Sequence, residues 1–174
     1  MQQGDKFPHN TEFLYIPVNK QEDPLSCSRP IKLSFDKLID QGALLILSIP
    51  GAFSPTCTET HLPDILNNVG KLKALGIKNV VIYAVNDAFV MNAWGKLLLN
   101  KYNVDDSLPI LFASDPNSKF TQANGLGVDK STFGIGFRSD RFAMVVKDHE
   151  IKYLKRDPTG LEGSGSKGIL TAKL

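Results

Sequence analysis

Two apolar stretches of strand length flank a helical segment in the first half of the chain. Residues 43–49 (ALLILSI) and 79–85 (NVVIYAV) are nearly continuous in apolar character, which is typical of strands buried on both faces of a sheet. Between them, Pro55 suits the first position of a helix that runs to about residue 69 and that Pro63 kinks. This order predicts a right-handed βαβ unit with parallel strands.

The remaining pattern adds helices, strands and a hairpin to this unit. A thioredoxin-like fold of the α/β class, with a central mixed sheet flanked by helices, is the arrangement that such a set of elements predicts. The 174 residues suit a single domain over residues 1–174. We expect helices over 34–40, 88–100, 116–124 and 167–173, strands over 13–16 and 109–113, and an antiparallel hairpin of 142–147 with 151–155.

Composition excludes several classes of protein. The net charge of +2, without a Lys/Arg-rich run, argues against a nucleic-acid partner. No transmembrane segment is expected, since no stretch approaches the ~20 apolar residues of a span, and no secretory signal is recognisable at the N-terminus. Two cysteines, Cys27 and Cys57, are too few for a disulfide framework, and the chain has no C-x-x-C motif of the zinc or dithiol kind.

Cys57 stands where a helix follows a buried strand. With Ser54 as N-cap and Pro55 at the first helical position, Cys57 lies in the first turn. Backbone N–H groups and the helix dipole favour an anion there, which predicts a nucleophilic thiolate. Burial as an inert thiol is the alternative. His61, four residues on, shares the helix face and is either a hydrogen-bond partner or a packing residue.

These residues resemble a known family. The pattern Pro50-x-x-x-Ser54-x-x-Cys57 is similar to the peroxiredoxin motif P-x-x-x-(T/S)-x-x-C, and the string PGAFSPTCTETHLP resembles the type II, atypical class. The likeness continues through 86–89, 93–94, 112–117 and 138–146, and covers most of residues 4–157.

The resemblance implies a thiol peroxidase that reduces hydrogen peroxide and alkyl hydroperoxides. It makes Cys57 the peroxidatic cysteine, which becomes a sulfenic acid. It further implies that Ser54 hydrogen-bonds the peroxide, that Pro50 excludes water, and that Arg141 contacts the thiolate and the peroxide, with Arg138 as the rival for that role. An arginine suits the task because its planar fork can hold an oxyanion and a thiolate together. No flavin, haem or metal cofactor is implied.

A second thiol is expected to resolve the sulfenic acid. Type II enzymes often carry a resolving cysteine near the C-terminus, where this chain reads Gly163-Ser164-Gly165-Ser166. Cys27 lies upstream instead, which resembles the fungal alkyl-hydroperoxide-reductase, or peroxisomal-membrane-protein-20-like, branch. We expect Cys27 to resolve Cys57; the alternative is a spectator Cys27 and an external thiol. The class implies thioredoxin as reductant, with glutaredoxin or glutathione as alternatives, and a homodimer.

The last three residues of the chain predict a cellular location. Ala172-Lys173-Leu174 is a variant of the S-K-L peroxisomal address, so we expect the peroxisome, with the cytoplasm as the alternative if Leu174 packs inward.

A thioredoxin-type oxidoreductase is disfavoured because Thr58-Glu59-Thr60 follows Cys57 without a second cysteine. The non-enzymatic alternative is a redox-sensing or chaperone-like module on the same fold, without peroxidase turnover.

Overall fold

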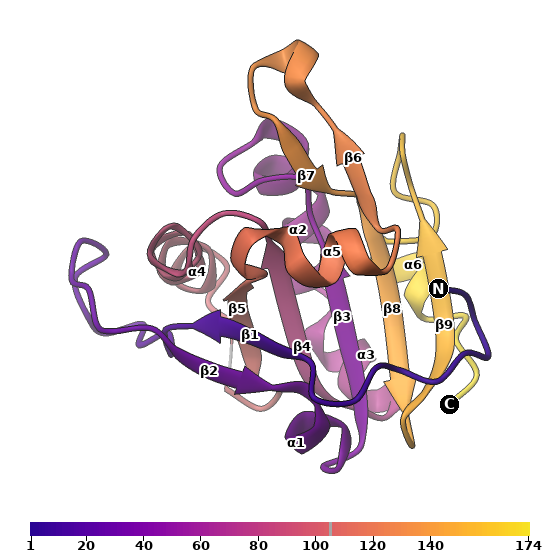
Figure 1. The fold of residues 1–174 in the computed structure, drawn as a ribbon. Helices are drawn as coiled ribbons and strands as arrows, with labels where there is room; N and C mark the ends of the chain where they lie inside the picture. The colour runs from indigo at the N-terminus through magenta and orange to yellow at the C-terminus, as the bar shows by residue number, and fades with distance from the viewer. Residues whose placement is uncertain (105) are drawn as a thin grey trace.

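A seven-stranded mixed sheet in the order β2-β1-β5-β4-β3-β8-β9 forms the centre of the molecule (Figure 1). The computed structural model describes residues 1–104 and 106–174. Its parallel part consists of β3 (Ala43–Ser48), β4 (Ile77–Ala84) and β5 (Ile110–Ser114). The parallel βαβ unit and the mixed sheet predicted from the sequence are therefore confirmed.

Antiparallel strands extend the sheet on both sides. β1 (Glu12–Tyr15) pairs with β5 and with the edge strand β2 (Ile31–Ser34). On the other side β8 (Phe142–Lys147) pairs with β3 and with β9 (Glu150–Arg156). Asp148 and His149 join β8 to β9 with φ values of 53° and 56°, the left-handed conformations that a two-residue hairpin turn requires. The predicted hairpin is thus confirmed.

Helices cover both faces of the sheet, which explains the continuous apolar character of its central strands. Leu45, Leu47, Val80 and Ile82 belong to a core cluster on one face. The alternate residues Leu44, Ile46, Val81 and Tyr83 belong to a cluster on the other. The first face packs against α2 (Leu62–Leu66), α3 (Val69–Leu75), α4 (Ala88–Lys101) and α6 (Ser166–Ile169), and the second against α1 (Phe35–Ile39) and α5 (Lys119–Ala123).

The helical segment after β3 differs from the single kinked helix that was predicted to run to about residue 69. It begins as a π-helix, η1 (Thr56–His61), continues as α2, ends at Leu66, and is followed after a turn by a separate helix, α3. The Leu62 N–H donates to the Cys57 carbonyl oxygen, five residues back. Pro63 has no N–H to donate four residues back, so the wider register accommodates it better than a regular α-helix.

The segment after β5 also departs from the prediction of one helix over 116–124. Pro116–Ser118 forms a 3₁₀ turn, η2, in which Asn117 and Ser118 have φ values of 55° and 53°. The regular helix α5 begins only at Lys119. The Asp115 carboxylate accepts hydrogen bonds from the N–H groups of Phe120 and Thr121, so a side chain outside the helix sets its start.

A small arm projects from the body of the molecule and was not foreseen. It contains β6 (Gly127–Asp129), the 3₁₀ turn η3 (Ser131–Phe133) and β7 (Phe137–Ser139), and stands at the top of Figure 1. Strands of three residues are too short to give a readable alternation. At the C-terminal end, α6 is shorter than the helix predicted over 167–173. Within the described ranges, the helices are all too short or too polar to cross a membrane.

Candidate active site

Cys57 lies at the carboxyl end of β3, as the second residue of the π-helix η1. Only 1% of its surface is exposed. The backbone reaches it through a turn in which Phe53 adopts a φ of 58°. π-Helical turns are rare and are frequently found at functional sites. The position is also the edge of a parallel sheet at which α/β proteins build ligand sites.

Ser54 does not cap the helix with its side chain, which corrects the expectation for this residue. Its hydroxyl donates to the Gly51 carbonyl oxygen at 2.7 Å, and its own carbonyl accepts from the Thr58 N–H at 2.9 Å. The Ala52 N–H donates to Oδ1 of Asn86 at 3.0 Å. The turn that begins at the half-buried Pro50 is therefore held by its own residues and by Asn86.

Arg141 immediately precedes β8, the strand adjacent to β3 in the sheet, and is 9% exposed. Its guanidinium divides between two partners. Nη2 donates to Cys57 Sγ at 3.6 Å, and Nη1 donates to Nδ1 of His61 at 2.9 Å. The structure thus brings Cys57 and Arg141 together, although 84 residues separate them.

His61 is fully buried beside Arg141, and its hydrogen bonds define its tautomer. Nε2 donates to the Ser164 carbonyl oxygen at 2.9 Å, because a carbonyl can only accept. Nδ1 is then free to accept from Arg141. Burial lowers the pKa of His61 to about 4, with the charge of Arg141 acting in the same direction. The imidazole is therefore neutral at ordinary pH. Of the two roles that the sequence left open for His61, hydrogen-bond partner or packing residue, the structure shows the hydrogen-bond partner.

The backbone around Arg141 is fixed by strand and side-chain bonds. The Arg141 N–H donates to Oδ1 of Asp140 at 2.9 Å, and its carbonyl accepts from the Asp157 N–H at 2.9 Å. The Ser48 hydroxyl, at the end of β3, donates to the Asp140 carbonyl at 2.7 Å. These contacts fix the backbone of Arg141 next to the cysteine loop, the turn from Pro50 that leads to Cys57. They thereby fix the point from which the guanidinium extends toward the sulfur.

The C-terminal loop supplies residues that the sequence did not point to. Oδ2 of Asp157 accepts from the Ser164 N–H at 2.6 Å, from the Ser164 hydroxyl at 2.7 Å and from the Gly163 N–H at 2.9 Å. This carboxylate holds the Ser164 carbonyl against His61. A chain of contacts thus runs from Asp157 through Ser164, His61 and Arg141 to Cys57, and the sequence carried only the Gly/Ser character of the loop as a signal.

Arg138, the rival of Arg141, lies in β7 and faces other groups. Its Nε donates to the Ile135 carbonyl at 2.8 Å, and Nη1 reaches Oδ1 of Asn86 at 3.4 Å. Within the described part of the chain, Arg138 makes no hydrogen bond to Cys57. The two arginines therefore have different roles in position. Arg141 contacts the sulfur, whereas Arg138 contacts Asn86, the residue that holds the cysteine loop through the Ala52 N–H.

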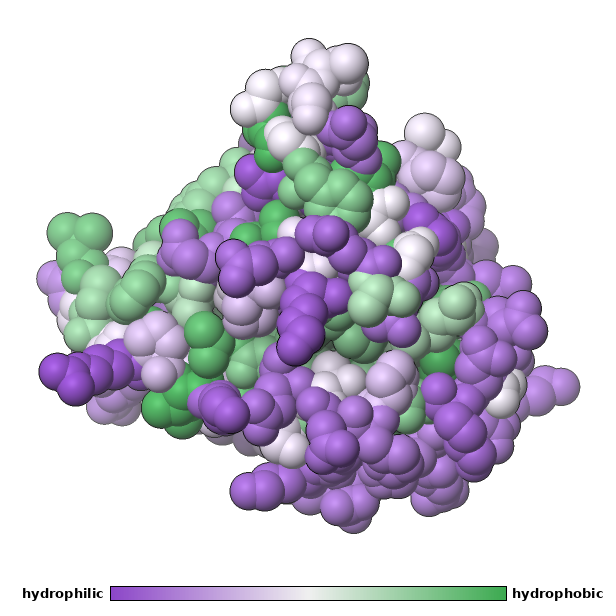
Figure 2. All heavy atoms as spheres, in the orientation of Figure 1, coloured by the Kyte–Doolittle hydropathy of each residue, from purple (hydrophilic) through white to green (hydrophobic). Residues whose placement is uncertain are grey.

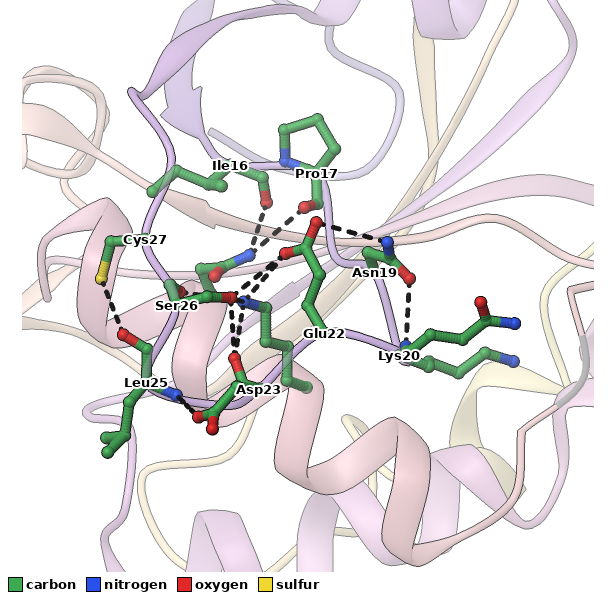
Figure 3. Close-up of polar contacts among 12 residues, drawn as sticks. Ile16, Pro17, Asn19, Lys20, Glu22, Asp23, Leu25, Ser26 and Cys27 are labelled. Carbon is green, nitrogen blue, oxygen red and sulfur yellow. Dashed lines mark hydrogen bonds and ion pairs between the residues drawn. The ribbon is translucent and has the colours of Figure 1, made fainter.

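The fold does not place the two cysteines, Cys27 and Cys57, in contact with each other. It is exposed, in the loop between β1 and β2, while Cys57 is buried, and both are free thiols. Its Sγ lies 3.6 Å from the Leu25 carbonyl oxygen, as drawn in Figure 3. Leu25 itself is 88% exposed at the same loop.

Lys96, a buried lysine of α4, anchors the loop that carries Cys27. Its side chain is 1% exposed, and Nζ donates to the carbonyl of Asp23 at 3.3 Å and to the carbonyl and hydroxyl of Ser26 at 3.0 and 2.8 Å. It also pairs with Oε2 of Glu22 at 3.2 Å, and this hydrogen bond lowers the pKa of the Glu22 carboxyl. In Figure 3, Glu22, Asp23 and Ser26 lie close together, and Cys27 lies outside this cluster.

Comparison with known proteins places this geometry in a family. The Redoxin family model matches residues 2–168. A putative peroxisomal peroxiredoxin of Lipomyces kononenkoae is 38% identical over 97% of this chain and 98% of its own, and the peroxiredoxin AHP1 of Chaetomium thermophilum is 36% identical over 98% and 94%. The crystal structure of reduced Prx3 of Vibrio vulnificus in complex with H₂O₂ superposes with a TM-score of 0.79, at 30% identity over 98% of this chain and 94% of that chain.

The chain belongs to the redoxin family and has its thioredoxin-like fold. Within that family it is a type II peroxiredoxin of the fungal AHP1 branch, and hence a thiol-dependent peroxidase that acts on peroxides with a thiol reductant.

Proposed function

We propose that Cys57 is the peroxidatic cysteine and that Arg141 is the residue that orients and activates it. The guanidinium held between His61 and the sulfur, with Nη2 at 3.6 Å from Sγ, is the observation that carries this proposal. A cation at this distance stabilises the thiolate, and the planar fork is suited to bind a peroxide oxygen at the same time. Ser54 and Pro50, in the turn that precedes the π-helix, are the further groups that we assign to the peroxide side of the site.

The reaction follows from these positions. The Cys57 thiolate attacks one oxygen of a hydroperoxide, the O–O bond breaks, and the other oxygen leaves with a proton as water or an alcohol. The guanidinium of Arg141, held beside the sulfur, stabilises the negative charge as it moves from sulfur to the leaving oxygen. Cys57 is thereby oxidised to a sulfenic acid.

Cys27 is the residue that we assign to the resolving step. Its thiolate attacks the sulfenic sulfur, and the two cysteines form a disulfide with release of water. A disulfide needs Cα atoms within about 7 Å, so the buried Cys57 must leave its pocket or the loop of Cys27 must move. The π-helical turn and Pro63 make the Cys57 segment a weak part of the helix, which supports local unwinding there.

The reductant that returns this disulfide to two thiols is proposed to be thioredoxin, with glutaredoxin or glutathione as the alternatives. We further propose a homodimer. The arm of β6 and β7 supports it, because Phe133, Ile135 and Phe137 are 76%, 44% and 40% exposed. Figure 2 shows hydrophobic side chains around the base of this arm, at the top of the view. A second copy of the chain is the partner that would cover them.

For location we propose the peroxisome, directed by Ala172-Lys173-Leu174, with the cytoplasm as the alternative. The name of the Lipomyces relative supports it. Ala172 is buried and Leu174 packs partly against the core, whereas Lys173 is exposed, so a receptor could bind these residues only after the last turn frays. A fluorescent reporter carrying residues 165–174 should enter peroxisomes, and an otherwise identical reporter ending in Ala172-Lys173-Ser should not; a cytosolic first reporter would refute the assignment.

The catalytic proposal is tested by stopped-flow peroxide reduction with wild type, Cys57→Ser and Cys27→Ser. We expect Cys57→Ser to consume no peroxide. Cys27→Ser should keep a first turnover, measured as one sulfenic acid per chain by mass spectrometry, and lose the disulfide and thioredoxin-linked turnover.

Non-reducing electrophoresis of the oxidised wild type then separates the two possible disulfides. A covalent dimer indicates a bond between chains, and a monomer with no free thiols indicates a bond within one chain. Unchanged thioredoxin-linked turnover in Cys27→Ser would reject the resolving role of Cys27 and leave that of Cys57 standing.

A further inference from the structure

Two histidines and an aspartate meet away from the cysteine site. His9 belongs to the N-terminal segment, Asp36 to the first turn of α1, and His149 to the turn between β8 and β9. The N-terminal segment is fastened to the hairpin by the Phe7 N–H, which donates to the His149 carbonyl at 2.9 Å. Figure 1 shows that segment crossing the ends of β8 and β9 on the side of α1. Three distant parts of the chain therefore present one potential ligand each.

We propose that His9, Asp36 and His149 form a binding site for a divalent transition-metal cation, of which Zn²⁺ is the best match. Nδ1 of His9 lies 3.4 Å from Oδ1 of Asp36, and Nδ1 of His149 lies 3.6 Å from the same oxygen. All three atoms are within 4.8 Å of one another. Zinc bonds nitrogen and oxygen at about 2.0–2.2 Å in tetrahedral geometry, which places neighbouring ligand atoms about 3.3–3.6 Å apart.

A carboxylate outside the triad sets the tautomer of His149. Its Nε2 donates to Oδ1 of Asp40 at 3.2 Å. When the ring carries a single proton, on Nε2, its Nδ1 presents a lone pair toward Asp36 that a cation can bind. In metal sites, the histidine nitrogen that does not bind the metal often donates to a carboxylate. That hydrogen bond orients the ring and raises its basicity.

Two acceptor atoms then face each other without a donor between them. Oδ1 of Asp36 and Nδ1 of His149 are both shielded from solvent, and neither makes a hydrogen bond within the described part of the chain. The other oxygen of Asp36 accepts from the Asn10 N–H at 2.8 Å, so the carboxylate is oriented with Oδ1 toward the imidazoles. A cation between these atoms would satisfy both of them.

The donor set selects the class of ion. Two imidazole nitrogens and one carboxylate suit Zn²⁺ and its neighbours Co²⁺, Ni²⁺ and Cu²⁺, whereas Mg²⁺ and Ca²⁺ prefer oxygen ligands alone. Because the three ligands come from three segments, a bound ion would tie the N-terminal segment to α1 and to the hairpin. It would stabilise the folded chain over the unfolded one, in which no such site exists.

Calorimetric titration with Zn²⁺ tests the proposal on the full chain carrying Cys27→Ser and Cys57→Ser, which removes thiols as competing ligands. We expect one equivalent bound, and a dissociation constant at least tenfold higher in His9→Gln and in His149→Gln. Asp40→Asn should weaken binding about 10- to 100-fold, as for other second partners of metal-bound histidines. Asp148→Asn is the matched control, since Asp148 lies in the same turn outside the triad, and its affinity should be unchanged.

Two further measurements make the outcome decisive. At Zn²⁺ ten times above the dissociation constant, the thermal midpoint should rise by about 3–6 °C in the cysteine-free chain and by no more than about 2 °C in His9→Gln, whose exposed imidazole can be replaced without loss of the fold. Co²⁺ should give a visible absorption spectrum that the two histidine variants lack. Equal Zn²⁺ affinity in parent and histidine variants would overturn the proposal. Absence of Zn²⁺ binding to the cysteine-free chain would overturn it as well.

Discussion

Arg141 donates to Nδ1 of His61 through one terminal nitrogen and to Sγ of Cys57 through the other, at 2.9 and 3.6 Å. The short contact to the neutral imidazole fixes the plane of the guanidinium. His61 thus sets the direction of the longer contact to sulfur, although within the described part of the chain it makes no hydrogen bond to the sulfur itself. His61 is in this sense a positioning residue, and the Ser164 carbonyl behind it completes the support.

Replacing His61 should slow peroxide reduction without abolishing it. In His61→Leu the Nη1 donor and the Ser164 carbonyl lose their partner, and a lost buried hydrogen bond of this kind costs about 1–3 kcal/mol. We expect the second-order rate constant for peroxide to fall about 10- to 100-fold. His61→Gln can restore one of the two bonds and should recover part of the loss. Equal rates in wild type and His61→Leu, measured by stopped flow, would contradict the positioning role.

His61 also predicts how stability depends on pH. Its pKa in the fold is lowered by burial to about 4 from an ordinary value of 6.5. Between these pH values the unfolded chain binds a proton that the folded chain excludes, so the free energy of unfolding falls as the pH drops from about 6.5 to about 4. We expect His61 to account for about 3 kcal/mol of this fall.

Urea unfolding at several pH values checks that expectation against a variant. His61→Gln lacks the titrating group, so the difference in unfolding free energy between wild type and variant should shrink as the pH is lowered from 7 to 4. A difference that stays constant over this range would mean that His61 titrates normally in the folded chain.

The two arginines of the region should behave differently when shortened to lysine. Arg141→Lys leaves a single ammonium that cannot span His61 and Cys57 together, and we expect at least a tenfold loss in the rate of Cys57 oxidation. Arg138→Lys is the matched control, because Arg138 contacts Ile135 and Asn86, and its rate should remain within about threefold of wild type. Measuring sulfenic acid formation isolates this step from resolution.

Lys96 should affect the second cysteine and not the first. Lys96→Met removes the ammonium that holds Asp23 and Ser26, and the loop carrying Cys27 should loosen. We expect Cys57 oxidation to proceed at the wild-type rate, the rate of disulfide formation to change, and limited proteolysis within residues 19–28 to increase. Lys101→Met, on the same helix but exposed, is the control and should leave all three unchanged. Unaltered proteolysis in Lys96→Met would show that the loop is held by other contacts.

Local chemistry was enough to predict several elements. The short helix after Ser34 is capped by the Ser34 hydroxyl as expected, at 3.5 Å from the Lys37 N–H. The buried strands β3 and β4 and the β8–β9 hairpin were readable because strand burial and turn conformation leave a mark on neighbouring residues. The π-helix was not readable, since its register depends on how Pro63 and the sheet share the space around Cys57.

For the cysteine site, the sequence by itself determined that a thiol follows a buried strand at a helix start, and its motif pointed to Ser54, Pro50 and Arg141. Which arginine contacts the sulfur, and that His61 and the Asp157–Ser164 loop stand behind it, was decided only by the tertiary structure. The reason is physical: motifs record residues whose spacing is set by one helix or turn, whereas contacts across 80 or 103 residues exist only after β8 has paired with β3 and the C-terminal loop has packed against the same helix.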